Sequence, residues 1–213
     1  MTDIASEIEA VKRAIGGRRI PAGDGRSVVL RRSYDAPIED VWHACTDPDR
    51  LRRWFLPVTG DLRLGGRFQL EGNAGGEVLR CEPPRLLAVS WVYGDRPADE
   101  VELRLSPGAD GATVVELEHA TAPGTAEGLA GVGVGWDLAL PALAMHLRGE
   151  TVDPAEFEES PATREHVMRS TRAWGAVLEG AGVASAAEAA AVVEKTAAFY
   201  APDPAPAPEG DEG

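Results

Sequence analysis

The chain has 213 residues, of which 44% are hydrophobic, so it is long enough for one well-packed core and an appendage. Its formal net charge is −14, and an acidic surface repels phosphate backbones, which argues against nucleic-acid binding. Its apolar runs are short and interrupted by glycine, proline or charge, and its first residues lack an apolar signal region, so we expect a cytoplasmic protein without a membrane span.

The N-terminal part of the chain reads as a helix, a strand and two short helices. Apolar side chains recur at helical spacing over residues 3–15, which predicts an N-terminal helical arm within residues 1–24. Residues 26–34 have the composition of a strand. Pro37 and the pair Asp47-Pro48 are helix start signals, because aspartate caps a helix and proline fits its first turn.

The middle of the chain predicts an antiparallel sheet. Short alternating segments separated by turn residues predict strands over residues 58–64, 66–72, 76–82, 86–93, 100–106 and 112–119. Val101 and Leu103 face one side of their strand, whereas Glu102 and Arg104 face the other. One apolar face and one polar face are typical of an antiparallel sheet that covers a core.

A longer helix is expected after this sheet. The glycine-rich residues 120–135 predict a loop, and residues 136–148 predict a helix that Pro141 is expected to kink near Asp137.

The remaining residues predict an appendage. Residues 150–200 predict a helical C-terminal extension with capping boxes at 153–156 and 185–188. Its apolar stripes need a partner, either the outside of the sheet domain or a second subunit. Residues 201–213 are acidic and rich in proline, which predicts a disordered tail.

The sequence offers little catalytic or metal-binding chemistry. Cys45 and Cys81 lack the spacing of metal ligands, so we expect two reduced, partly buried thiols. The segment GVGVGW at 131–136 fails the spacing of a dinucleotide-binding loop and is expected to flex at a cavity mouth. The pair Asp99-Glu100 is interpreted as solvated charge. We therefore expect no catalytic residue, no metal and no cofactor.

The order of these elements resembles the START-like (SRPBCC) superfamily, and more closely its bacterial branch named after the activator of heat-shock protein 90 ATPase. The resemblance rests on APIEDVWHACTDPDRLRRWF at 36–55, the Gly65-Gly66 turn before Phe68, EPPRLLAVSW at 82–91, ATVVELEH at 112–119 and the Gly-Trp pair at 135–136. It covers about residues 26–149 and implies a START-like domain over 25–149. The implied fold is α+β: a helix-grip fold with a curved antiparallel sheet of about seven strands around a long C-terminal helix.

The resemblance also implies a cavity between the sheet and that helix, and strand periodicity indicates the same inward faces. The expected cavity-wall residues are Trp54, Phe55, Phe68, Leu70, Trp91, Leu103, Leu117, His119, Trp136 and Leu140. A mostly apolar cavity with one polar group suits a small hydrophobic molecule or a lipid. We expect His119 to be a hydrogen-bonded histidine at a strand end; the alternatives are a ligand contact or a general base.

The leading hypothesis is therefore a non-catalytic protein that binds a small hydrophobic molecule or lipid. One alternative is a polyketide cyclase- or hydrolase-like enzyme in which His119 or Tyr93 moves protons in the same cavity. Another is a chaperone-associated protein, as the family name suggests. The helical extension leaves a homodimer open as a further possibility.

Overall fold

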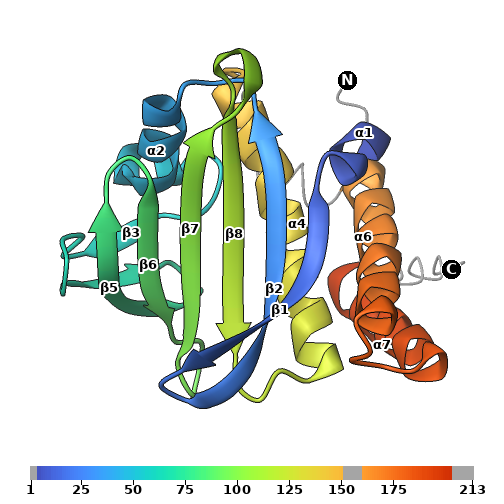
Figure 1. Ribbon diagram of the computed structural model, residues 1–213. Coiled ribbons are helices and arrows are strands. Elements are labelled where there is room, and N and C mark those ends of the chain that lie inside the picture. The colour runs from blue at the N-terminus through green and yellow to red at the C-terminus, as the bar shows by residue number, and fades with distance from the viewer. Residues whose placement is uncertain (1–3, 151–159, 203–213) are drawn as a thin grey trace, which may run out of the picture.

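The computed structural model describes residues 4–150 and 160–202, and within them eight strands form one antiparallel sheet in the order β1-β2-β8-β7-β6-β5-β4-β3 (Figure 1). The strands are β1 (Lys12–Ile20), β2 (Gly23–Tyr34), β3 (Val58–Gly60), β4 (Arg67–Leu70), β5 (Gly75–Glu82), β6 (Leu86–Trp91), β7 (Asp99–Pro107) and β8 (Thr113–Thr121). The helices are α1 (Ile4–Glu9), α2 (Ile38–Thr46), α3 (Pro48–Leu51), α4 (Ala126–Leu147), α6 (Pro161–Gly180) and α7 (Ala186–Tyr200). The predicted α+β class is confirmed, with eight strands in place of about seven.

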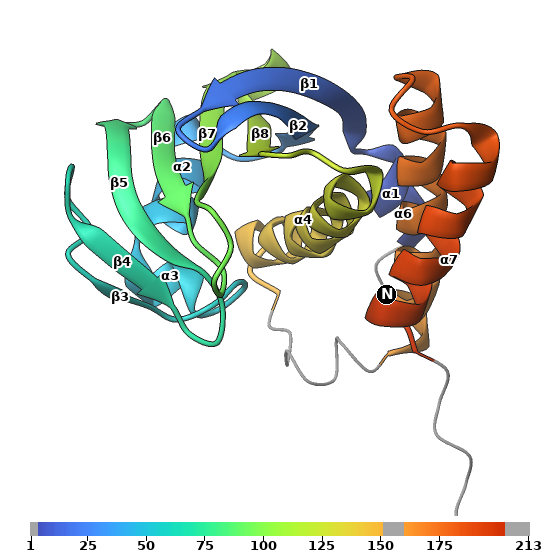
Figure 2. The same cartoon turned by 90° about the horizontal axis from the view of Figure 1, so that it is seen from below.

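The sheet curves around α4, and Figure 2 shows this helix lying on the concave side. Helix α2 contacts α4 and β7, while α3 contacts β3. Asp47 begins α3 as predicted, because its carboxylate accepts a hydrogen bond of 3.0 Å from the backbone N–H of Arg50. Strands β3 and β4 are shorter than predicted, since the chain turns between them and the backbone N–H of Gly66 donates to the carbonyl of Arg63.

The predicted helix over residues 3–15 is wrong beyond Glu9. Residues 12–20 form strand β1, which pairs with β2 from Lys12 opposite Arg31 to Ile20 opposite Gly23. Gly16 and Gly17 weaken a helix by about 1 kcal/mol each relative to alanine. Gly16 also suits a crowded sheet, because a Cβ there would lie 2.6 Å from Ser27 Oγ. The apolar residues that fit helical spacing over 3–15 therefore lie partly on the short helix α1 and partly on the edge strand β1.

The predicted loop over residues 120–135 is also wrong from Ala126 onward. Helix α4 starts there, and the hydroxyl of Thr125 accepts a hydrogen bond from the backbone N–H of Gly128. The segment GVGVGW is thus helical rather than a flexible loop. Gly133 permits close packing of α6, because a Cβ there would lie 2.3 Å from the indole of Trp174. Burial of that indole compensates for the poor helix propensity of glycine.

Pro141 lies inside α4 and leaves the carbonyl of Asp137 without its usual helical donor, because proline has no N–H. His166 of α6 replaces that donor, with its Nε2 at 2.8 Å from the Asp137 carbonyl oxygen. The carbonyl can only accept, so Nε2 carries the proton. Burial lowers the pKa of His166, which favours the neutral ring with its proton on Nε2.

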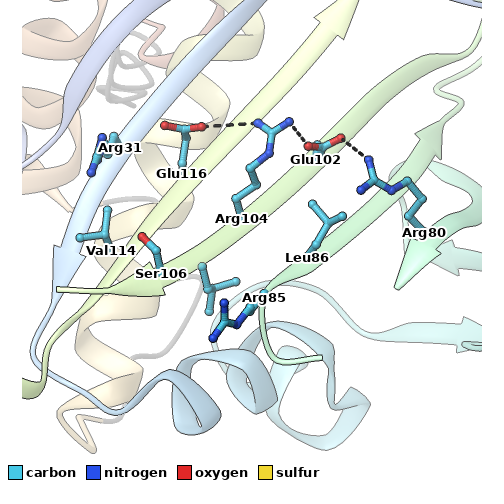
Figure 3. Close-up of a pocket in the computed structure, with 10 residues that line it drawn as sticks. Arg31, Arg80, Arg85, Leu86, Glu102, Arg104, Ser106, Val114 and Glu116 are labelled. Atoms are coloured by element: carbon cyan, nitrogen blue, oxygen red, sulfur yellow. Dashed lines mark hydrogen bonds and ion pairs between the residues drawn. The ribbon is translucent and has the colours of Figure 1, made fainter. Parts of the chain in front are cut away.

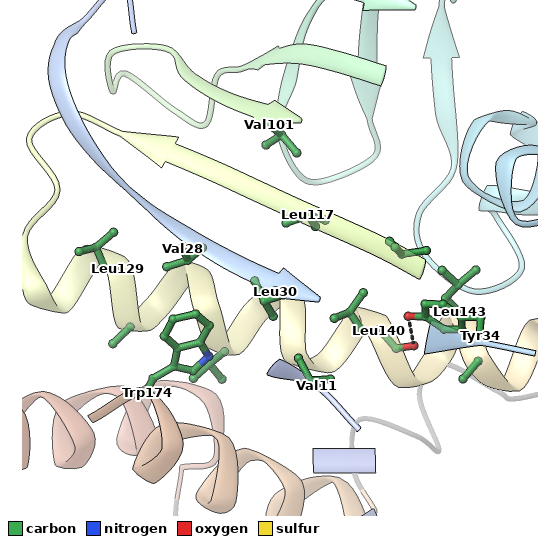
Figure 4. Close-up of a cluster of buried hydrophobic side chains, with 14 of the residues drawn as sticks. Val11, Val28, Leu30, Tyr34, Val101, Leu117, Leu129, Leu140, Leu143 and Trp174 are labelled. Carbon is green, nitrogen blue, oxygen red and sulfur yellow. Dashed lines mark hydrogen bonds between the residues drawn. The ribbon is translucent and has the colours of Figure 1, made fainter. Parts of the chain in front are cut away.

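The hydrophobic core lies between the sheet and α4 and continues to α6, as Figure 4 shows. Val28 and Leu30 of β2 are almost fully buried between α4 and the sheet. The Tyr34 hydroxyl donates to the carbonyl of Leu140 at 3.1 Å, which ties the end of β2 to the middle of α4.

Helix α4 corrects the expectation that no segment is long and apolar enough to cross a membrane. Its 22 residues meet that criterion on length and composition alone, although 56% of its most apolar window is buried inside the structure. Because sheet and helices cover it, α4 serves here as a core helix.

The C-terminal extension forms α6 and α7, which lie beside α4, α1 and β1 (Figure 2). The predicted stripe on α6 is buried against this domain, with Val167, Trp174 and Leu178 each at most 1% exposed. The predicted capping box of Ser185 and Glu188 is present at the start of α7. The expected capping box at 153–156 and most of the expected tail at 201–213 lie outside the described residues.

A buried carboxylate joins these parts of the fold. Asp137, on α4, is 0% exposed and lies opposite Arg13 of β1, whose guanidinium donates to both carboxylate oxygens at 2.8 and 2.9 Å. Ser170 Oγ and Trp174 Nε1 of α6 donate to the same carboxylate at 2.6 and 2.9 Å. Asp137 is therefore not an N-terminal helix residue, as its expected place at the helix start implied, but the contact point of three elements.

The outer face of the sheet is charged. Figure 3 shows Arg104 between Glu102 and Glu116, with Arg80 on the other side of Glu102. These residues, with Arg31 and Arg85, border a shallow depression of about 390 Å³. The expected division of the strand into an apolar and a polar side is confirmed, so an apolar ligand has its matching surface on the inner face.

We expect Asp137→Asn to destabilise the fold by about 3 kcal/mol or more, because it leaves the Arg13 guanidinium buried without its counter-charge. Denaturant unfolding measures this loss. Asp24→Asn is the matched control, since the Arg19–Asp24 pair is exposed on both sides and its loss should leave stability unchanged. Equal unfolding midpoints for the two variants would contradict the role given to Asp137.

Candidate functional site

An apolar cavity of about 180 Å³ lies between the concave face of the sheet and α4. Nine of the ten expected wall residues line it, namely Trp54, Phe55, Phe68, Leu70, Trp91, Leu103, Leu117, Trp136 and Leu140. Strands β3 to β8 supply the sheet side and α4 the opposite side, and the end of α2 and the segment after α3 complete the wall. Val89, Val101 and Val115 add further aliphatic surface.

Aromatic rings form one end of this cavity. The rings of Phe55 and Trp136 are stacked with centroids 5.9 Å apart, and Trp91 lies 5.5 Å from Trp136. The indole N–H of Trp54 donates to the carbonyl of Ala44 at 2.9 Å, which fixes that ring against α2. Rings at these separations pack favourably with each other and offer flat apolar surfaces to a ligand.

His119 is the expected wall residue that does not line the apolar cavity. It borders a second, larger groove of about 640 Å³, which lies between the sheet and helices α4 and α7 and adjoins the cavity at Phe55, Trp91 and Trp136. Its side chain is 4% exposed, and its Nε2 lies 3.2 Å from Asp99 Oδ2. Its Nδ1 lies 3.1 Å from Trp136 Nε1.

These contacts fix the tautomer of His119. The indole N–H of Trp136 can only donate, so Nδ1 of His119 must accept and carries no proton. The proton of the neutral ring is therefore on Nε2, which donates to Asp99. His119 is a hydrogen-bonded histidine, as expected, and both of its ring nitrogens already have partners.

Two thiols line the cavity, those of Cys45 and Cys81, and Cys81 is exposed rather than partly buried as expected. Burial raises the pKa of Cys45 to about 12, so the thiol stays neutral near pH 7 and is a weak nucleophile. Within residues 4–150 and 160–202, no group of three or more His, Cys, Asp or Glu side chains is placed to hold a metal ion. The wall of the inner cavity is mostly apolar.

Comparison with known protein families gives a match over residues 35–148 to the family described as Activator of Hsp90 ATPase homolog 1-like protein. The match spans more than half of the chain. The chain belongs to this family. No protein with a curated description matches the chain.

Solved structures support the same family assignment. The crystal structure of CalU16 from Micromonospora echinospora is 50% identical and covers 79% of this chain and 98% of its own, with a TM-score of 0.71. DynU16, described as a putative protein in the dynemicin biosynthetic locus, is 27% identical over 59% of this chain and 48% of its own, with a TM-score of 0.56. Protein MLL2253 from Mesorhizobium loti is 25% identical over 60% of this chain and 100% of its own, with a TM-score of 0.53.

Asp99 is a residue of the candidate site that the sequence analysis did not identify. It was interpreted as solvated charge beside Glu100, yet its side chain faces inward and is 14% exposed. The signal was available, because Asp99 precedes Val101 by two residues and strand side chains alternate. Asp99 pairs with Trp91 across the strands, which puts it at the end of the inward row.

We expect ¹⁵N NMR of His119 at pH 8 to show a protonated Nε2 and an unprotonated Nδ1. Trp136→Phe removes the indole donor while keeping an aromatic ring, so the tautomer preference should weaken. A wild-type spectrum with the proton on Nδ1 would contradict the hydrogen-bond assignment.

Proposed function

We propose that this protein binds a small apolar molecule in the cavity between the sheet and α4, without carrying out a reaction on it. The observation that carries the proposal is the composition of the cavity wall, which consists almost entirely of aliphatic and aromatic side chains. An apolar cavity on the order of 150 Å³ stays dry and takes up benzene. The inner cavity, at about 180 Å³, therefore suits a ligand part with one or two rings.

The relatives support a small molecule as the class of ligand. DynU16 is described as a protein of the dynemicin biosynthetic locus, and CalU16 shares half of the aligned residues with this chain. A biosynthetic locus produces a small molecule, and an apolar cavity suits an intermediate or product of that kind. We extend this role to the present chain as part of the proposal, and a lipid is the alternative occupant.

The pair Asp99 and His119 is the observation that favours an enzyme as a second candidate. A histidine beside a carboxylate is a common arrangement for proton transfer. However, Nδ1 of His119 accepts from Trp136 and Nε2 donates to Asp99, so neither nitrogen is open to a substrate. Burial keeps the Cys45 thiol neutral, so it is a weak nucleophile. Binding is therefore the function that we put first.

Leu103→Trp should weaken binding of 1-methylnaphthalene at least about tenfold, because the larger side chain fills the cavity from the middle of β7. Isothermal titration calorimetry measures the affinity, and circular dichroism checks that the variant is folded. Leu79→Trp is the matched control, since Leu79 is on β5, is 37% exposed and does not line the cavity. A folded Leu103→Trp variant that binds as well as the wild type would refute the proposed site.

A further inference from the structure

The groove beside the inner cavity has a different character from the cavity itself. Its wall combines aromatic rings with charged side chains, and its volume of about 640 Å³ is larger than that of the inner cavity. Phe55, Trp91 and Trp136 line both spaces. The two compartments are therefore back to back, and a ligand part held in one lies next to the other.

Asp99 is the fixed polar group of this groove. Its Oδ2 accepts from His119, and among the residues that the structure describes its Oδ1 has no hydrogen-bond partner. His119 is itself held by Trp136, so the orientation of the carboxylate is set by a chain of hydrogen bonds. The Asp99 carboxylate is 14% exposed and can only accept hydrogen bonds, so a ligand group that contacts its second oxygen has to be a donor.

The other charges of the groove do not supply that donor. Lys195 of α7 lies 2.7 Å from Glu127 of α4, so these two side chains satisfy each other across the groove rim. Arg96 lies on the turn before β7 and is exposed to solvent. No ion pair joins Arg96 to Asp99 within the described residues, which leaves Asp99 facing the groove.

We propose that the groove holds the polar end of the ligand, and that Asp99 accepts a hydrogen bond from an amine or hydroxyl group there. This inference rests on the proposed function, because it takes the apolar part of the same ligand to occupy the inner cavity. The ligand class is then an amphipathic molecule: a compact apolar or aromatic body that carries a hydrogen-bond donor, with a cationic amine bound more tightly than a neutral alcohol.

The C-terminal extension completes this polar half of the site. Thr196, Phe199 and Tyr200 of α7 border the groove. The Tyr200 hydroxyl donates to the carbonyl of Gly131 at 2.9 Å, which fastens α7 to α4. Phe199 is 78% exposed and lies against Tyr200, so it presents an apolar ring at the groove edge. The extension thereby gives this chain ligand contacts that lie outside the family match at 35–148.

Four probes with the same apolar body test the inference: 1-methylnaphthalene, 1-naphthylmethylamine, 1-naphthylmethanol and 1-naphthoate. Calorimetry on the full chain should show the amine bound most tightly and the carboxylate most weakly. Asp99→Asn keeps the shape of the side chain and should weaken the amine about tenfold or more, with 1-methylnaphthalene unchanged. Asp95→Asn is the matched control, because it removes the same charge from the neighbouring turn but does not line the groove.

The outcomes separate the two proposals. If 1-methylnaphthalene binds but the amine has no advantage, or if Asp99→Asn and Asp95→Asn weaken the amine equally, the role of Asp99 is refuted and the cavity proposal stands. Tighter binding of the carboxylate would assign the groove to Arg96 and would also refute it. If the amine binds through Asp99 but 1-methylnaphthalene does not bind, the inner-cavity proposal fails together with the placement of the apolar body, and only the contact between Asp99 and the amine stands. If no probe binds, both fail.

Discussion

The fold depends on one buried carboxylate, that of Asp137 in the middle of α4. It accepts hydrogen bonds from Arg13 at the edge of the sheet and from Ser170 and Trp174 of α6. A buried ion pair adds little net stability compared with apolar packing, but it is strongly directional, and removing one partner is costly. Its effect here is to fix how α4 is rotated and how far it lies from β1 and α6.

That rotation determines the candidate site. Trp136 and Asp137 are adjacent, and consecutive side chains on a helix point about 100° apart. With Asp137 directed at β1 and α6, Trp136 is directed toward the sheet, where it lines both compartments and holds Nδ1 of His119. Pro141 adds to the same attachment, because it frees the carbonyl that His166 binds. One face of α4 therefore binds the C-terminal extension, and another face of the same helix shapes the cavity.

The inward faces of the strands were predictable because strand alternation is a strong signal, whereas the cavity itself was expected only from the family resemblance. Leu103 and Leu117 are placed by period-two patterning alone, and Trp91 by the same rule on β6. The failures occurred where one pattern fits two structures. Ile4, Ile8, Val11 and Ile15 fit a helix, yet Gly16 and Gly17 allow a strand that gains a full ladder with β2. Gly133 favours a loop in the sequence, but in the structure it lies in a helix because the indole of Trp174 packs directly against it. Asp99 was missed because a charged residue beside another acid is usually solvated, although its alternation with Val101 places it on the inward face, where it contacts His119.

The central claim is that the apolar space between the sheet and α4 is a ligand site. The most direct test is a crystal of the protein soaked with 1-bromonaphthalene, with data collected at the bromine absorption edge. The account predicts an anomalous peak inside the cavity, among Leu103, Leu117 and Leu140, in contact distance of the Trp136 ring. A cavity without bromine signal, with peaks confined to the outer surface, would contradict it.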